Sequence, residues 1–234
     1  MIPKIIHYCW LSGDLIPEKL EKCMKSWKEK LPDYEFMLWD KNRFDIDSIL
    51  WTKQAYEVKK YAFAADYIRL YAVYTYGGIY LDMDVEILKS FNNLLESKYI
   101  LGFEGKEGIE AGIFGAEKNA DWVKTCLDYY SGRSFIQDNG TYDIRPLPCI
   151  MYEIISKKYS HLKLLPFDYL TAKSYKTGKI TVTENTITIH HFAGSWVSKK
   201  YKIIRGLYLF IERNRFLFTL YQITYKKIKN ILFH

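Results

Sequence analysis

Short apolar runs alternate with amphipathic stretches along most of this chain. Apolar runs shorter than a helix predict buried strands, and apolar residues three or four apart predict helices. We therefore expect strands at 5–11, 34–39, 79–81 and 186–190, with two further apolar runs at 99–103 and 109–115. Helices are expected at 17–31, 54–76, 91–97, 119–130 and 147–158. Because strands and helices interleave, the pattern predicts an α/β domain with a mainly parallel sheet.

Proline and glycine mark the ends of several expected elements. Pro17 suits a first helical turn, where an N–H group would lack an intrahelical partner anyway. Gly77-Gly78 ends the long helix, and a short apolar strand then runs into Asp82. No linker or repeat interrupts the chain before about residue 198. We therefore expect one domain at 1–198 and a tail of different character at 199–234.

Composition narrows the class of protein. Of the 234 residues, 49% are hydrophobic and 26% are charged, which excludes a disordered, collagen-like or low-complexity chain. The four cysteines form no CxxC pair, so free thiols are expected rather than a disulfide scaffold or a zinc site. The N-terminus lacks a signal-peptide pattern, and no uncharged apolar stretch reaches the roughly 18 residues of a membrane span. These features predict a cytoplasmic protein.

The positive charge is concentrated in the tail. The chain carries a net charge of +7, whereas residues 199–234 contain nine Lys/Arg and one Glu, so the body is close to neutral. On a helical projection the apolar and basic residues of the tail fall on separate arcs. A basic amphipathic helix with aromatic residues is typical of binding to an anionic membrane surface. The alternative is a helix that packs on the body, and no nucleic-acid-binding motif accompanies the charge.

Two carboxylates separated by one residue, Asp82 and Asp84, follow the short strand after Gly77-Gly78. Ligands of open α/β sheets bind at the carboxyl ends of strands. Carboxylate oxygens with room for phosphate suit Mg²⁺ or Mn²⁺. Two chemistries use such a pair: a phosphatase with the first Asp as nucleophile, and a cation that clamps the diphosphate of a nucleotide sugar. Two solvated acids in a turn are the non-functional alternative.

Two further groups of residues suggest a site. Asp66 and Arg69 are three apart and share a helix face. Arginine can form a fork on a diphosphate and a carboxylate can accept from sugar hydroxyls, although the two can also form an ordinary ion pair. His190-His191 ends the last expected strand, before Gly194-Ser195-Trp196. A histidine beside two carboxylates favours Mn²⁺, and a structural histidine is the alternative.

Three stretches occur in one order along the chain: Ile2-Pro-Lys-Ile-Ile-His-Tyr-Cys-Trp10, Phe63-Ala-Ala-Asp-Tyr-Ile-Arg69 and Tyr76-Gly-Gly-Ile-Tyr-Leu-Asp-Met-Asp84. Together they closely resemble glycosyltransferase family 32, whose members carry a DXD motif. The family includes many bacterial capsule and polysaccharide glycosyltransferases, and the glucosylating domain of the large clostridial toxins is more distantly similar. The resemblance is dense over about residues 2–90 and thinner beyond them.

The resemblance implies a GT-A (Rossmann-like) nucleotide-sugar-binding fold and a retaining transfer from a nucleotide sugar, usually UDP-linked, with Mn²⁺ or Mg²⁺. It assigns the following roles: Trp10 stacks on the uracil; Asp66 and Arg69 hold the donor sugar; Asp82 contacts ribose and metal; Asp84 binds the metal; His191, or else His190, is a further metal ligand; Ser195 and Trp196 close on the diphosphate. Asp82, Asp84 and Arg69 are the expected catalytic residues. Glu110 stands where such enzymes commonly carry an Asn that faces the acceptor, so it is either an acceptor contact or a surface acid.

These observations predict a metal-dependent hexosyl- or N-acetylhexosaminyltransferase at the inner face of a membrane. Its expected donor is a UDP-sugar, and its expected acceptor is a glycan or lipid-linked glycan of a capsular or surface polysaccharide. Two alternatives stay open: a DxD-type phosphatase, and a non-catalytic membrane- or nucleic-acid-binding module on an α/β scaffold. The phosphatase is disfavoured because the pair stands at position 82 and no convincing second acidic pair follows.

Overall fold

The computed structural model describes residues 1–104, 108–175, 177–194 and 206. The chain divides into two compact units, Met1–Ala193 and Gly194–His234. Only Gly194 and Gly206 of the second unit are described, so the expected boundary at 198 and the expected tail helix lie outside the described residues. Within the described part, no helix combines the length and apolar character that a membrane crossing needs.

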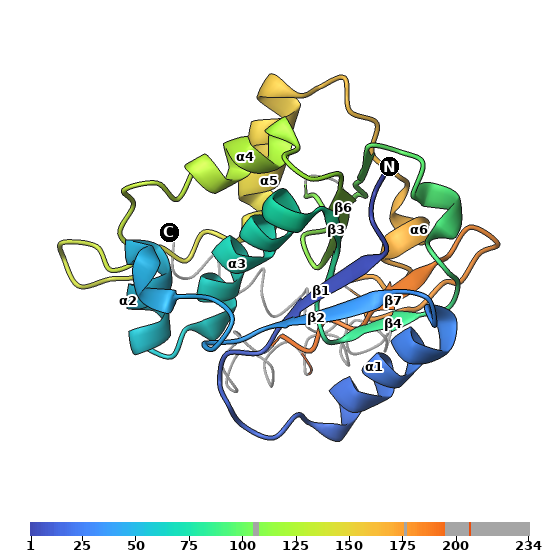
Figure 1. Ribbon diagram of the computed structural model, residues 1–234, viewed down its shortest axis with the longest axis horizontal. Helices are drawn as coiled ribbons and strands as arrows, with labels where there is room; N and C mark the ends of the chain where they lie inside the picture. Colours follow the sequence, from blue (N-terminus) through green and yellow to red (C-terminus); the bar gives the residue numbers. More distant parts are fainter. Residues whose placement is uncertain (105–107, 176, 195–205, 207–234) are drawn as a thin grey trace, which may run out of the picture. The chain divides into compact units, whose positions relative to one another are not determined.

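Strands and helices alternate through the first unit, as the hydrophobic pattern predicts (Figure 1). The strands are β1 (Ile5–Cys9), β2 (Glu35–Trp39), β3 (Gly78–Leu81), β4 (Val85–Ile87), β5 (Tyr99–Ile100), β6 (Ile113–Ala116) and β7 (Thr188–His190). The α-helices are α1 (Glu18–Lys30), α2 (Leu50–Glu57), α3 (Tyr61–Tyr76), α4 (Asp121–Asp128), α5 (Leu147–Lys158) and α6 (Phe167–Leu170). Two short 3₁₀ turns are η1 (Ile46–Ser48) and η2 (Asn92–Leu94).

The main sheet has five strands in the order β2-β1-β3-β6-β5. Strand β1 is parallel to both β2 and β3, whereas β6 is antiparallel to both β3 and β5. The expectation of a mainly parallel sheet is therefore wrong for half of the pairings. Parallel neighbouring strands need a crossover connection, which is usually helical. Helix α1 supplies the connection from β1 to β2, and helices α2 and α3 supply the connection from β2 to β3. Between β3 and β6 the described residues contain no α-helix, and the chain returns antiparallel.

A second sheet pairs β4 with β7 in antiparallel register, with Val85 opposite His190. The sequence pattern did not separate β4 from the strand before it. Helix α1 covers this small sheet, and the indole Nε1 of Trp27 donates to the carbonyl oxygen of Val85 at 2.6 Å. The pairing brings the segment after β3 beside the end of β7, although about a hundred residues separate them in sequence.

Two of the expected helices differ in the structure. The expected helix at 54–76 is two helices, because Lys59 adopts a left-handed conformation with φ 57°. The N–H of Lys60 then donates to the carbonyl oxygen of Ala55 at 2.7 Å, a helix-ending bond of the Schellman type. The expected helix at 91–97 is only the single turn η2. The helices expected at 17–31 and 119–130 are present with shifts of one or two residues at each end, and the helix at 147–158 has the expected bounds.

The core lies on both faces of the main sheet. Alternating side chains of a strand point to opposite faces. Tyr80 accordingly belongs to the cluster under α2, α3, α4 and α5, whereas Ile79 and Leu81 belong to the cluster that includes Trp27 of α1. Figure 1 shows α1 on one side of the sheet, and α3 and α4 on the other. The central strand β3 is therefore buried on both faces, and only its carboxyl end is left to carry polar side chains.

Candidate functional site at the carboxyl end of β3

The turn before β3 fixes where the two aspartates emerge. Gly77 ends α3 with φ 68° and Gly78 follows with φ 104°, both in the region that favours glycine. A Cβ on Gly78 would lie 2.6 Å from the carbonyl oxygen of Ile5 in β1, so the close approach also requires glycine. Strand β3 then ends at Leu81, and the carbonyl oxygen of the next residue, Asp82, accepts from the N–H of Val85 at 3.0 Å. This tight turn carries both carboxylates of the DXD motif.

His190 joins the two aspartates from the neighbouring sheet. Its Nε2 lies 3.3 Å from Oδ1 of Asp84 and 3.9 Å from Oδ2 of Asp82. One ligand atom from each of the three residues falls within 4.8 Å of the other two. His191 is not part of this cluster, and its Nε2 lies 2.8 Å from Oε2 of Glu86. The structure thus places the alternative histidine, and not the first choice, beside the pair.

Arg69 and Asp66 approach the same point from α3. The guanidinium Nη2 lies 3.3 Å from Oδ1 of Asp66, and Nη1 lies 3.3 Å from Oδ1 of Asp82. Nη1 also donates to the carbonyl oxygen of Ala111 at 2.9 Å, and the guanidinium lies over the ring of Tyr80. The arginine is therefore both the partner of an intrahelical ion pair and a contact of the DXD motif.

The charges in this group influence one another strongly. Burial opposes the charge of Arg69, but the neighbouring carboxylates raise its pKa above the usual value, so it stays a cation. Burial raises the pKa of Asp66 to about 7, although Arg69 acts in the opposite direction. Burial alone would also raise the pKa of Asp84, but the His190 charge and the N–H of Ala193 lower it to about 2. Asp84 is thus ionised under all ordinary conditions.

Glu110 is a buried carboxylate beneath the cluster, with 0% exposure. Its Oε1 accepts from the N–H of Gly112 at 2.8 Å and lies 3.0 Å from Nδ1 of His190. Its Oε2 accepts from the hydroxyl of Thr171 at 2.5 Å. Burial alone would lower the pKa of His190, but Glu110 and Asp84 raise it well above 6.5. The expectation of a surface acid is wrong, because the Glu110 carboxylate has no solvent exposure, whereas the expected acceptor contact stays a prediction.

The residues of the cluster suit a divalent cation. Two carboxylate oxygens and one imidazole nitrogen are a donor set that Mn²⁺ accepts. Gly112 borders this set, and a Cβ there would lie 2.6 Å from Cε1 of His190 and 2.8 Å from Oδ2 of Asp82. Only a glycine leaves that space free. The donor set and this open cradle together fit the metal that the motif predicts.

The remaining expected site residues divide into two groups. Trp10 directly follows β1, which is parallel to β3, so it lies at the same edge of the sheet as the DXD motif. Its indole Nε1 donates to the carbonyl oxygen of Asp14 at 2.8 Å. Ser195 and Trp196 lie outside the described residues. Their expected role at the diphosphate stays a prediction.

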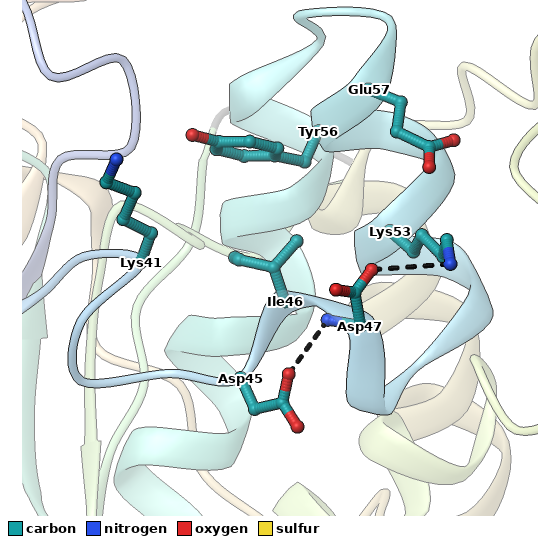
Figure 2. A pocket seen from close by; sticks show the side chains of 7 residues that line it. All are labelled: Lys41, Asp45, Ile46, Asp47, Lys53, Tyr56 and Glu57. Carbon is teal, nitrogen blue, oxygen red and sulfur yellow. Dashed lines mark hydrogen bonds and ion pairs between the residues drawn. The ribbon is translucent and has the colours of Figure 1, made fainter.

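A surface hollow of about 370 Å³ lies between the segment 41–47, which follows β2, and α2 (Figure 2). It is lined by Lys41, Asp45, Ile46, Asp47, Lys53, Tyr56 and Glu57. Figure 2 shows that Asp47 engages neighbours within this group: its N–H donates to Asp45 at 3.1 Å, and its carboxylate lies 3.5 Å from Nζ of Lys53. None of the expected site residues lines the hollow. It is separate from the cluster at β3, and we assign it no ligand.

The sequence did not reveal the residue that contacts His190 from within the core, Glu110, or its hydrogen-bond partners Gly112 and Thr171. Glu110 interrupts an apolar run, and a charge in such a run is rarely buried without a partner, so a signal was present. Gly112 follows two residues later without any local pattern to mark it. Thr171 comes directly after the short helix α6, and nothing in its neighbourhood points to Glu110.

Comparisons with known proteins agree with the predicted family resemblance. Residues 17–101 match the family described as "Glycosyltransferase sugar-binding region containing DXD motif". Inositol phosphoceramide mannosyltransferase 3 of Schizosaccharomyces pombe is 35% identical over 121 residues, which cover 50% of this chain and 34% of that protein. A protein of Acanthamoeba polyphaga mimivirus, described as an uncharacterized glycosyltransferase, is 32% identical over 152 residues, 59% of this chain and 58% of that one. The chain thus spans about a third to three fifths of the length of these relatives.

Solved structures show the fold. The PaToxG glycosyltransferase superposes with a TM-score of 0.51 at 16% identity, covering 69% of this chain and 71% of the other. The apo form of the glycosyltransferase GlyE of Streptococcus pneumoniae gives a TM-score of 0.51 at 13% identity, over 95% of this chain and 64% of the other. The chain has the GT-A fold that was expected from its motifs. The two relatives and the two solved structures named above are all described as glycosyltransferases or as a mannosyltransferase.

Proposed function

We propose that this chain is a metal-dependent glycosyltransferase that moves a hexosyl group from a nucleotide sugar to a glycan or lipid-linked glycan. The observation that carries the proposal is the convergence of Asp82, Asp84 and His190 at the carboxyl end of the central strand. The match of residues 17–101 to a sugar-binding region and the GT-A fold support it. We take His190 in place of His191 as the third metal ligand.

The charges of the site suit the departure of a nucleoside diphosphate, which gains negative charge as the bond to the sugar breaks. A divalent cation held by Asp82, Asp84 and His190 would supply the neutralising charge. Tyr80 and Arg69 orient Asp82, because the phenol donates to its Oδ1 at 2.9 Å and the guanidinium lies within 3.4 Å of both oxygens. The N–H of Ala193 donates to the carboxylate of Asp84 at 2.5 Å and fixes it in turn.

The residues that we assign to the nucleotide-sugar donor are those at the edge of the sheet where β1 and β3 end. We assign Trp10 to the base of the nucleotide because it lies beyond β1, at the edge where β3 presents the DXD motif. Asp66 and Arg69 are assigned to the donor sugar, since they line the same edge from α3. The expected closing residues Ser195 and Trp196 complete the proposal, together with a retaining stereochemistry.

Two kinds of donor are proposed with equal weight, a UDP-sugar and a nucleotide-linked mannose. The motif resemblance implies a UDP-sugar, whereas several relatives are named mannosyltransferases. Two of those names specify inositol phosphoceramide, which supports a lipid acceptor rather than a free sugar. We retain a surface polysaccharide as the product and propose that the basic segment 199–234 holds the enzyme at the inner face of a membrane.

Donor hydrolysis without acceptor tests the proposal. Purified chain is incubated with UDP-glucose, UDP-galactose, UDP-N-acetylglucosamine or GDP-mannose, with Mn²⁺, Mg²⁺ or a chelator, and release of nucleoside diphosphate is measured. We expect metal-dependent release from one donor and a loss of at least a hundredfold in Asp84→Asn. The matched control is Asp47→Asn, which removes a carboxylate of the distant hollow and should leave the rate unchanged.

The same assay separates the alternatives. Release of phosphate from simple phosphomonoesters, with no attack on nucleotide sugars, would instead identify a DxD-type phosphatase. The absence of both turnover and nucleotide binding, with the fold intact, would leave a non-catalytic module. An equal rate in Asp84→Asn and the wild-type chain would remove the DXD motif from the mechanism.

A further inference from the structure

Both oxygens of the Glu110 carboxylate accept a hydrogen bond from a fixed donor. Oε1 accepts from the backbone N–H of Gly112, and Oε2 accepts from the hydroxyl of Thr171. The side chain has 0% exposure, so water does not compete for these bonds. Two hydrogen bonds from distant parts of the chain, just before β6 and just after α6, therefore hold the carboxylate plane rigidly.

The carboxylate in turn holds one edge of the His190 ring. Nδ1 lies 3.0 Å from Oε1 of Glu110, so the proton on Nδ1 is committed to that bond. The opposite nitrogen, Nε2, is then the atom that faces Asp84 at 3.3 Å. Phe192 stacks on the ring, with centroids 4.1 Å apart and planes at 28°. The ring is thus held at its edge by a carboxylate and at its face by an aromatic side chain.

A second carboxylate–histidine pair one residue further on provides a comparison. Glu86 and His191 also meet at 2.8 Å, but Nε2 is the atom engaged and both side chains are about one third exposed. Among the described residues, no second carboxylate contacts His191. The two pairs therefore share their chemistry and differ in burial and in which ring nitrogen is engaged.

We propose that Glu110 is a positioning residue that fixes the tautomer and orientation of His190, so that its Nε2 lone pair faces a divalent cation shared with Asp82 and Asp84. The inference rests on the proposed function, because it presupposes the metal site. Histidine ligands of metals commonly donate their other ring N–H to a carboxylate, and loss of that partner typically costs about 10- to 100-fold in affinity. The pair Glu86–His191 has no such role.

Mn²⁺ titration without nucleotide, followed by electron paramagnetic resonance, tests the inference. Glu110→Leu removes the acceptor while filling the space, and we expect its Mn²⁺ dissociation constant to rise at least tenfold. Glu110→Gln keeps an amide oxygen for Nδ1 and an amide group for Thr171, so it should retain most of the affinity. The matched control Glu86→Leu should bind Mn²⁺ as the wild-type chain does.

A spectroscopic readout separates positioning from a merely structural role. Electron spin echo modulation from bound Mn²⁺ detects a coordinated imidazole nitrogen. We expect this nitrogen signal in the wild-type chain and in His191→Ala, and its loss in folded Glu110→Leu. If Glu110→Leu does not fold, Thr171→Val is the variant that tests the inference. It removes only the hydrogen bond to Oε2 of Glu110 and should weaken Mn²⁺ binding two- to fivefold.

The outcomes are distinguishable from failure of the proposed function. A wild-type chain that does not bind Mn²⁺ overturns the metal site itself, and with it this inference. Tight Mn²⁺ binding in the wild-type chain with unchanged affinity in Glu110→Leu, or in Thr171→Val where the former does not fold, overturns the inference alone. An equal loss in Glu86→Leu would do the same.

Discussion

His7 is a buried histidine that the fold can accept only as a neutral ring. It has 0% exposure, and its Nδ1 accepts from the indole N–H of Trp39 at 3.1 Å. Nε2 must therefore carry the proton, which it donates to the carbonyl oxygen of Gly77 at 2.7 Å. A second proton on Nδ1 would face the indole N–H. Chiefly because of burial, with a further contribution from the Arg43 charge, the pKa of His7 is lowered from 6.5 to about 4.

This shift makes the stability of the chain depend on pH in a defined direction. Between pH 6.5 and 4 the unfolded chain binds a proton at His7 and the folded chain does not, so stability falls as the pH is lowered through this window. Above pH 6.5 the contribution is fully present. A pH of 5 lies 1.5 units below the unfolded-state pKa of 6.5. At 1.36 kcal/mol per unit, the free energy of unfolding at pH 5 is therefore about 2 kcal/mol lower than at pH 7.

Urea unfolding at pH 5 and pH 7 measures this loss. His7→Gln has no titrating ring and keeps an amide donor for Gly77, so its free energy of unfolding should fall by about 2 kcal/mol less than that of the wild-type chain over this interval. Other ionisable groups affect both chains equally and cancel. The matched control is His161→Gln at an exposed position, which should keep the wild-type difference. Equal losses in His7→Gln and the wild-type chain would refute the lowered pKa of His7, and with it the neutral ring in the folded chain.

Three further substitutions test the site and its support. Gly112→Ala places a Cβ 2.6 Å from the ring of His190, so Mn²⁺ affinity in a titration should fall at least tenfold, and unchanged affinity would contradict the proposed cradle. Gly78→Ala forces φ 104° on a residue with a side chain, with a Cβ 2.6 Å from a backbone oxygen of β1; urea unfolding should show a loss of about 2 kcal/mol or more. Arg69→Met leaves the Asp66 carboxylate buried without its cation and should cost about 3–5 kcal/mol, whereas a loss below 1 kcal/mol would show that the pair contributes little.

Local sequence was sufficient for the elements that depend on neighbours along the chain. The helix expected at 147–158 has those bounds in the structure, because an apolar stripe and a proline in its first turn are local signals. Gly77-Gly78 ends a helix because only glycine takes that backbone cheaply. The short apolar strand after it ends at Leu81, directly before Asp82, since a carboxylate is not buried in the centre of a sheet without a partner.

Local sequence was insufficient where a choice depends on strand register. Successive residues of a strand face opposite sides, so a shift of one residue exchanges His190 and His191. The pairing of Val85 with His190 settles which of them meets Asp84, and that pairing joins segments about a hundred residues apart. The split of the expected helix at Lys59 and the antiparallel return to β6 likewise depend on packing.

The sequence by itself determined the α/β class, because strands and helices alternate along most of the chain. It also determined the DXD motif at a strand end and the place of Arg69 on the preceding helix, because these two features are specified within about twenty residues. Only the tertiary structure decided that His190 completes the cluster and that Glu110 lies buried beneath it. Glu110 lies in the segment before β6 and His190 ends β7, 80 residues further along the chain. A hydrogen bond across that separation exists only because the sheets bring β7 and the segment before β6 to the same end of β3.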